Sequence, residues 1–353
     1  MPLLDVKDLQ VYYKTTRGIV QAVDGVSFSV HEGENLGLVG ESGCGKTTAL
    51  KSIIRLFPVN IAHVSGTVDY HGQNILEMPM NDVRKLRWKE ISMIPQSAMN
   101  ALDPVYRLED QILEAIEAHE VLPPEEALDR IHRLFDLVGV GRNRLKDFPH
   151  QLSGGMIQRA CIAMALSCGS KIILADEPTT ALDVVVQDNI LQRIRELHRQ
   201  TRASMILSSH DISVIAETCE RVAVMYAGQV VEYGRSTQIF RTPYHPYTLG
   251  LEQTFPSIKG SKKRLIAIRG YPPNLVRPPM GCRFAPRCPF RIDPCVAQDP
   301  PLLEVEFRHF SRCIRADAID EIRERVSRKE TWEQACQNGW PSGVEKRKER
   351  EME

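Results

Sequence analysis

The chain has 353 residues, of which 42% are hydrophobic and 25% are charged. These fractions are close to those of average globular proteins, so the chain can form a packed core, with room for one large domain and a smaller one. Lysine plus arginine and aspartate plus glutamate both count 45. This balance argues against a protein held to nucleic acid by bulk charge, and we expect no nucleic-acid partner.

The apolar segments are short. None approaches the about 20 residues that a helix needs to cross a bilayer, and the first residues lack the charged and apolar regions of a signal peptide. We therefore expect a cytoplasmic protein that would reach a membrane only through a partner.

Alternating apolar and polar residues predict paired strands over the first 30 positions. Further strands are expected at residues 36–39, 64–71 and 91–94, and helical spacing dominates from about 105 to 167. Two apolar strands, 172–175 and 205–207, flank a helix around 190–197. Strand, helix and strand in this order predict an α/β fold with a parallel sheet.

The character of the chain changes near residue 240, where prolines become frequent. Because prolines cannot sit inside regular elements, we expect an irregular extension over residues 241–353 that follows a domain of residues 1–240. Residues 315–328 look helical within it, and the charged residues 346–353 are expected to form a solvated tail.

A glycine-rich loop at residues 40–47, Gly-Glu-Ser-Gly-Cys-Gly-Lys-Thr, matches the phosphate-binding loop pattern in full. Its glycines let backbone N–H groups face phosphates, and the next helix points its N-terminus at them. Lys46 would neutralise negative charge and Thr47 would ligate Mg²⁺. The residues expected to contact ATP here are Gly40, Ser42, Gly43, Cys44, Gly45, Lys46, Thr47 and Thr48.

Two adjacent acids, Asp176 and Glu177, end the strand at 172–175. Alone they are a weak signal, because strands that run out to solvent often end in acids. Together with a phosphate loop they predict a Mg²⁺ site, in which Asp176 holds the metal and Glu177 lies beside the attacking water.

Ser153, Gly154 and Gly155 precede a helical run. A serine followed by glycines caps a helix and also leaves free N–H groups for an anion. On these residues alone, an ordinary helix cap and an anion site are equally good interpretations.

The order of these motifs resembles the ABC ATPase domain over about residues 3–240. It comprises the phosphate loop, Gln96, residues 152–155, Asp176-Glu177, residues 181–183 and His210. The resemblance implies a RecA-like core with an antiparallel β subdomain and a helical subdomain. It also implies a head-to-tail dimer with two ATP molecules at the interface.

The resemblance implies a role for each residue that matches one of the family's motifs. Glu177 would act as base, His210 would bridge to the γ-phosphate, and Gln96 would sense that phosphate and join Thr47 and Asp176 around Mg²⁺. Ser153, Gly154 and Gly155 would contact the ATP of the opposite subunit, and Asp183 would couple the two sites. Tyr13 matches the aromatic that stacks on adenine, with Tyr12 as the alternative.

His245-Pro246-Tyr247 and the Pro/Cys-rich segment after it resemble the C-terminal extension of oligopeptide and dipeptide permease ATPase subunits. The resemblance implies an ATPase at the cytoplasmic face of the cell membrane that powers peptide import. Its partners would be two integral-membrane permease subunits and, indirectly, an extracytoplasmic substrate-binding protein. Met156 after the glycines favours a heterodimer with a second ATPase subunit.

Other functions are open to this sequence. Nickel, glutathione or oligosaccharides could replace peptides as the transported molecule. A soluble, non-transport ABC ATPase is a second alternative, but a second ATPase domain or a long coiled-coil insertion is absent. An exporter half would carry membrane spans and no such tail. A structural module without turnover conflicts with the intact Glu177 and His210.

Five of the nine cysteines crowd the last fifth of the chain. Four of them follow the spacing C-x5-C-x6-C-x17-C, at Cys282, Cys288, Cys295 and Cys313. Four thiolates suit an iron–sulfur cluster or a zinc ion. The absence of paired C-x2-C knuckles and the family resemblance favour a [4Fe–4S] cluster, with Zn²⁺ as the alternative and unliganded or disulfide-bonded cysteines as a third possibility. Cys336 lies outside the pattern.

Overall fold

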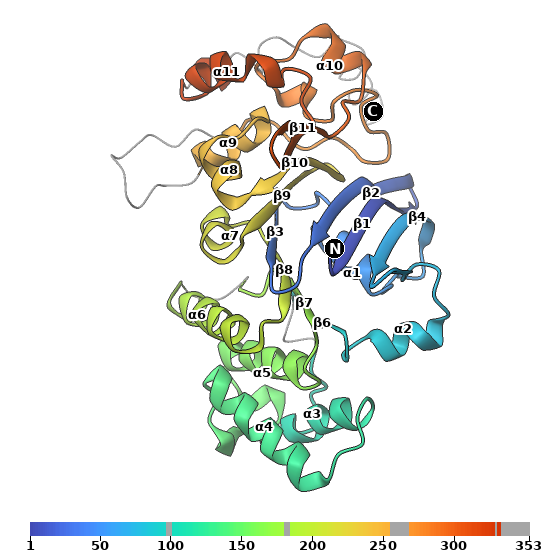
Figure 1. Ribbon diagram of the computed structural model, residues 1–353, viewed down its shortest axis with the longest axis vertical. Helices are drawn as coiled ribbons and strands as arrows, with labels where there is room; N and C mark the ends of the chain where they lie inside the picture. The colour runs from blue at the N-terminus through green and yellow to red at the C-terminus, as the bar shows by residue number, and fades with distance from the viewer. Residues whose placement is uncertain (97–100, 180–183, 255–267, 329, 333–353) are drawn as a thin grey trace, which may run out of the picture.

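The computed structural model describes residues 1–96, 101–179, 184–254, 268–328 and 330–332. In these ranges the strands form two sheets (Figure 1). An antiparallel sheet has the order β2-β1-β4-β5, and a larger sheet has the order β11-β12-β10-β9-β3-β8-β7-β6. The smaller sheet consists of β1 (Leu4–Thr15), β2 (Gly18–Val30), β4 (Ile61–Tyr70) and β5 (Gln73–Asn74).

The centre of the larger sheet is parallel, as the sequence predicts. Its parallel strands are β3 (Asn35–Val39), β6 (Ile91–Ile94), β7 (Ile172–Asp176), β8 (Ser204–Ser209) and β9 (Arg221–Tyr226). β10 (Gln229–Arg235) then pairs with β9 in the antiparallel sense. The predicted strands at 36–39, 91–94, 172–175 and 205–207 are therefore confirmed, each to within two residues.

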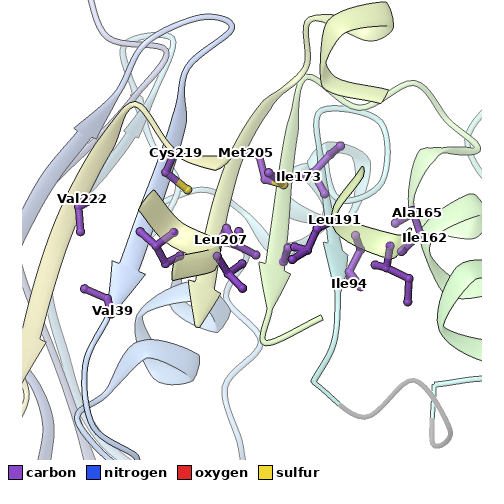
Figure 2. Packing of buried hydrophobic residues seen from close by; sticks show 14 of the residues in the cluster. Val39, Ile94, Ile162, Ala165, Ile173, Leu191, Met205, Leu207, Cys219 and Val222 are labelled. Atoms are coloured by element: carbon purple, nitrogen blue, oxygen red, sulfur yellow. The ribbon is translucent and has the colours of Figure 1, made fainter. Parts of the chain in front are cut away.

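The central strands β3, β7, β8 and β9 are buried on both faces, which explains their continuous apolar runs. Successive side chains of a strand point to opposite faces. In β7, Ile173 and Ala175 enter one core while Ile172 and Leu174 enter the other. Figure 2 shows the first core, a single cluster that contains strand residues such as Val39, Met205 and Leu207 and the helix residues Leu191, Ile162 and Ala165.

Helices cover both faces. α1 (Lys46–Ile53) contacts β1 and β2 of the small sheet and β7 and β8 of the large one, so it joins the two sheets. A group of helices at the bottom of Figure 1 consists of α3 (Leu108–Glu117), α4 (Pro124–Val138) and α5 (Gly154–Leu166). The remaining helices of this part are α2 (Met80–Leu86), α6 (Val184–Thr201), α7 (Ile212–Thr218) and α8 (Ser236–Arg241).

The C-terminal extension lies at the top of Figure 1 and is joined to the core by its own strands. It contains α9 (Pro246–Thr254), α10 (Asp293–Ala297), β11 (Leu303–Glu306), β12 (His309–Ser311) and α11 (Ile319–Val326). β12 pairs with β10 of the core and β11 with β12, so the extension continues the large sheet. It is therefore less irregular than its prolines predict. The boundary between residues 240 and 241 stays a prediction.

Within the described ranges, no helix combines the length and the apolar character needed to cross a bilayer.

A buried glutamate holds the extension to the core. Glu232 of β10 is 0% exposed and accepts hydrogen bonds from the backbone N–H groups of Tyr244 (2.6 Å) and His245 (3.0 Å). Nε2 of the buried His309, in β12, lies 2.8 Å from Oε1 of the same carboxyl group. One side chain thus joins β10, the start of α9 and β12. Buried polar groups of this kind are stable only when their hydrogen bonds are satisfied.

Glu232→Ala should lower the free energy of unfolding by about 3 kcal/mol, because it leaves buried donors without an acceptor. Urea unfolding followed by tryptophan fluorescence measures this change. Glu324→Ala, on the exposed side of α11, is the matched control and should change the midpoint little. Equal midpoints for the two variants would contradict the anchoring role of Glu232.

Candidate nucleotide site

The phosphate loop (Gly40–Thr47) begins where the fully buried strand β3 ends and leads into α1. Gly45, the residue before the helix, has φ +107°. A Cβ there would lie 2.3 Å from the carbonyl oxygen of Ala22, so only glycine fits. The loop therefore has the local geometry that the motif predicts, a tight turn that ends at a helix N-terminus.

Lys46 links the loop to Glu177, the acid that follows β7. Its side chain is 4% exposed, and Nζ donates a hydrogen bond to the Gly40 carbonyl at 2.8 Å. The same Nζ lies 3.7 Å from Oε1 of Glu177. A buried ammonium between a phosphate loop and a glutamate is well placed to balance the charge of a bound phosphate.

Asp176 has the surroundings of a Mg²⁺ ligand. Its Oδ1 accepts hydrogen bonds from Thr47 Oγ1 at 3.0 Å and from Ser208 Oγ at 2.7 Å. In the part of the chain that the structure describes, its buried Oδ2 has no hydrogen-bond partner. Hydroxyl and carboxylate oxygens are the ligands that Mg²⁺ prefers, and a buried carboxylate oxygen without a partner suits a cation. Asp176 and Thr47 therefore fit the predicted Mg²⁺ site.

Glu177 is the meeting point of the predicted catalytic residues. Its backbone has φ +45°, a left-handed conformation that is strained for a residue other than glycine, and its N–H donates to Ser208 Oγ at 3.0 Å. Gln96 Nε2 donates to Glu177 Oε2 at 3.1 Å, and His210 Nδ1 lies 3.4 Å from that oxygen. The structure therefore brings Lys46, Gln96, Glu177 and His210 together.

The two candidate adenine-stacking tyrosines have different surroundings. Tyr13 is half-buried, and its hydroxyl donates to Thr48 Oγ1 at 3.2 Å, so it lies against the helix that follows the phosphate loop. Tyr12 instead donates to Asp24 at 2.6 Å, and burial together with this bond raises its pKa to about 12. The position of Tyr13 favours it over Tyr12, and its stacking role stays a prediction.

Ser153 begins α5 as its N-cap, and its Oγ accepts a hydrogen bond from the Met156 N–H at 3.4 Å. Within the described chain, no hydrogen bond or ion pair joins residues 153–155 to the phosphate loop. The role of these residues across a dimer stays a prediction. Asp183, also predicted to act across the dimer, lies outside the described residues, together with residues 181–182.

The four cysteines of the extension line one cavity of about 20 Å³, with His245, Phe284 and Phe290 among their neighbours. That volume has room for about one water molecule. Burial raises the pKa of Cys282 to about 11 and that of Cys313 to about 12. The cysteines that line the cavity are Cys282, Cys288, Cys295 and Cys313, all free thiols. The described residues contain no group of three or more cysteine, histidine or acidic side chains already arranged to hold a metal ion.

Sequence reasoning missed Ser208, which bonds both Asp176 and the Glu177 N–H. Its signal was a pair of serines at the end of an otherwise apolar strand, directly before His210. It also missed Arg287, whose guanidinium pairs with Glu41 of the phosphate loop at 2.8 and 3.0 Å. No local pattern marks an arginine that is 246 residues away from its partner.

Known proteins share both parts of this architecture. The family model described as "ABC transporter" matches residues 23–180, and "Oligopeptide/dipeptide transporter, C-terminal region" matches residues 231–295. The ATP-binding cassette MJ0796, solved as a dimer bound to ADP and Pi, superposes with a TM-score of 0.60 at 27% identity. That comparison covers 66% of this chain and 98% of the cassette. The expected fold, an ABC-type ATPase with a C-terminal extension, is confirmed.

Relatives that align over most of this chain narrow the type of ABC protein to which it belongs. A probable peptide ABC transporter ATP-binding protein of Sinorhizobium fredii is 43% identical, covering 90% of this chain and 96% of the relative. The oligopeptide transport ATP-binding protein OppD of Escherichia coli is 41% identical, with 89% and 93% covered. The chain belongs to the ATP-binding subunits of oligopeptide/dipeptide ABC transporters.

Asp176→Asn should raise the Mg²⁺ concentration needed for half-maximal ATP hydrolysis at least about tenfold, because it removes a carboxylate charge beside the metal. A Mg²⁺ titration of the hydrolysis rate measures this shift. Asp211→Asn is the matched control, since Asp211 caps α7 and asparagine caps a helix equally well. If the two variants need the same Mg²⁺ concentration, Asp176 is not a metal ligand.

Proposed function

We propose that this chain binds ATP at the phosphate loop and hydrolyses it to power the import of peptides across a membrane. The observation that carries the proposal is the convergence of Lys46, Gln96 and His210 on Glu177, beside Asp176 and Thr47. Phosphoryl transfer to water needs a charged cradle, a metal site and a group that positions the water. This set of side chains can supply all three.

Each residue has a distinct task in this mechanism. Lys46 leaves its carbonyl acceptor to balance the β- and γ-phosphates, while the loop N–H groups hold their oxygens. Thr47, Asp176 and Gln96 would hold Mg²⁺, which neutralises charge on the phosphates. Glu177 would orient the attacking water and take its proton, and His210, whose side chain is 61% exposed, would contact the γ-phosphate.

The complete site would need a second subunit. We propose a head-to-tail pair in which Ser153, Gly154 and Gly155 of one ATPase, with the N-terminus of α5, face the ATP of the other. Asp183 would couple the two sites. The free N–H groups at the start of a 13-residue helix are suited to the γ-phosphate. The dimer of the MJ0796 cassette supports a paired assembly, and a heterodimer with a second ATPase subunit is the form proposed here.

Peptides are the proposed cargo because the relatives are described as peptide or oligopeptide transport proteins and because the extension matches that transporter type. The subunit would work with two integral-membrane permease subunits, at the cytoplasmic face of the cell membrane. An extracytoplasmic binding protein would deliver peptide to that permease. Specificity would then lie outside this chain.

Glu177→Gln should slow hydrolysis at least about hundredfold, because the amide cannot accept the proton of the attacking water, while ATP binding is retained. ATP turnover in the complex with its partner subunits and nucleotide binding are measured side by side. Glu217→Gln, on an exposed surface ion pair, is the matched control. Near-normal turnover by Glu177→Gln would refute the assigned base.

We also propose that Cys282, Cys288, Cys295 and Cys313 hold a [4Fe–4S] cluster, with Zn²⁺ as the alternative. Support comes from the donor set alone, since four thiols line one cavity of the extension. Soft thiolate donors favour iron–sulfur clusters and zinc over hard cations. Such a group would crosslink the loops that join the helices and strands of the extension.

The protein purified without oxygen should be brown and contain about four iron atoms per chain. Cys288→Ser should lose the colour and most of the iron but keep ATP binding. Cys168→Ser, a buried cysteine outside the cavity, should keep both. Colourless protein with one zinc ion per chain would show that the site binds zinc and not a cluster. Colourless protein without metal would refute both proposed occupants.

A further inference from the structure

The phosphate loop is held from outside by an arginine of the extension. Arg287 lies between Cys282 and Cys288 in the sequence and is 7% exposed. Its Nη1 donates to Glu41 Oε2 at 2.8 Å, and its Nη2 donates to Glu41 Oε1 at 3.0 Å. Two parallel bonds between a guanidinium and a carboxylate are stronger and more directional than single ones.

The rest of the guanidinium is also occupied. Nε donates to the Arg269 carbonyl at 3.0 Å, Nη2 to the Ile268 carbonyl at 3.2 Å, and Nη1 to the Tyr226 hydroxyl at 3.3 Å. These acceptors fix the plane of the guanidinium before it meets Glu41. A flexible lysine could not satisfy all of them, because its ammonium has three donors and no fork.

Glu41 is held through its backbone as well. Its N–H donates to the hydroxyl of Tyr247, a residue of α9, at 3.0 Å. Its carbonyl accepts from the Cys44 N–H at 3.2 Å and from Lys46 Nζ at 3.4 Å. The extension therefore holds the side chain and the amide of Glu41, while the loop itself holds the carbonyl.

The negative charge of Glu41 matters for the binding of ATP phosphates. Glu41 lies in a loop built for a polyanion, where an unpaired carboxylate would repel the phosphates. We propose that Arg287 is a positioning residue for ATP binding, which pairs with Glu41, neutralises it and keeps it turned away from the phosphates. The proposal rests on the nucleotide site proposed above.

Arg287→Met should weaken ATP binding by the full-length chain about tenfold, because it leaves Glu41 unpaired beside the phosphates. Isothermal titration with ATP and Mg²⁺ measures the dissociation constant. The double variant Glu41→Gln/Arg287→Met should regain most of the affinity, since the repelling charge is gone. Arg323→Met is the matched control: Arg323 also belongs to the extension, but it donates to the carbonyls of Thr242 and Pro243, so ATP affinity should be unchanged.

The outcomes separate the two proposals. If Lys46→Ala does not weaken ATP binding, the nucleotide site itself is wrong. If Lys46→Ala does weaken it but Arg287→Met does not, only the role of Arg287 is overturned. Equal losses in Arg287→Met and the double variant would also overturn it, because Arg287 would then act through the extension's structure and not through Glu41. Should Arg287→Met fail to fold, Arg287→Gln, which can still donate to the buried carbonyls, replaces it in the same comparison.

Discussion

The parallel register of β3, β7 and β8 is the constraint on which the nucleotide site depends. Val39 pairs with Ser209 across β3 and β8, and Asp176 pairs with Ser208 across β7 and β8. Parallel strands end at the same edge of a sheet, so the segments that follow them meet there. Those segments begin at Gly40, Glu177 and His210. A shift of one strand by one residue would turn its buried side chains to the wrong face and separate these three groups.

At this edge the charges compensate one another. Lys46 lies between the loop carbonyls and Glu177, and Thr47 and Ser208 share one oxygen of Asp176. Each charged side chain at this edge is therefore held by polar or oppositely charged partners of its own.

Three contacts that are at least partly buried join the extension to the core and to the nucleotide site. Glu232 joins β10 to α9 and β12, and Arg287 pairs with Glu41 of the phosphate loop. Arg283, 5% exposed, forms an ion pair with Asp24 of β2 and donates to the Ala227 carbonyl. Both arginines lie in the segment from Cys282 to Cys288. A change in the conformation of this segment at the cysteine cavity would therefore also move the arginine that contacts the phosphate loop.

The sequence by itself determined the chemistry-bearing motifs and the elements around them. Local patterns suffice there: a phosphate loop needs consecutive glycines at fixed spacing, and a doubly buried strand needs an unbroken apolar run. Only the tertiary structure decided which distant groups meet. The pairing of Arg287 with Glu41, the partners of Glu232 and the position of Ser208 depend on segments up to 246 residues apart. Those segments pack together through sheet order and burial and leave no periodic trace in the chain.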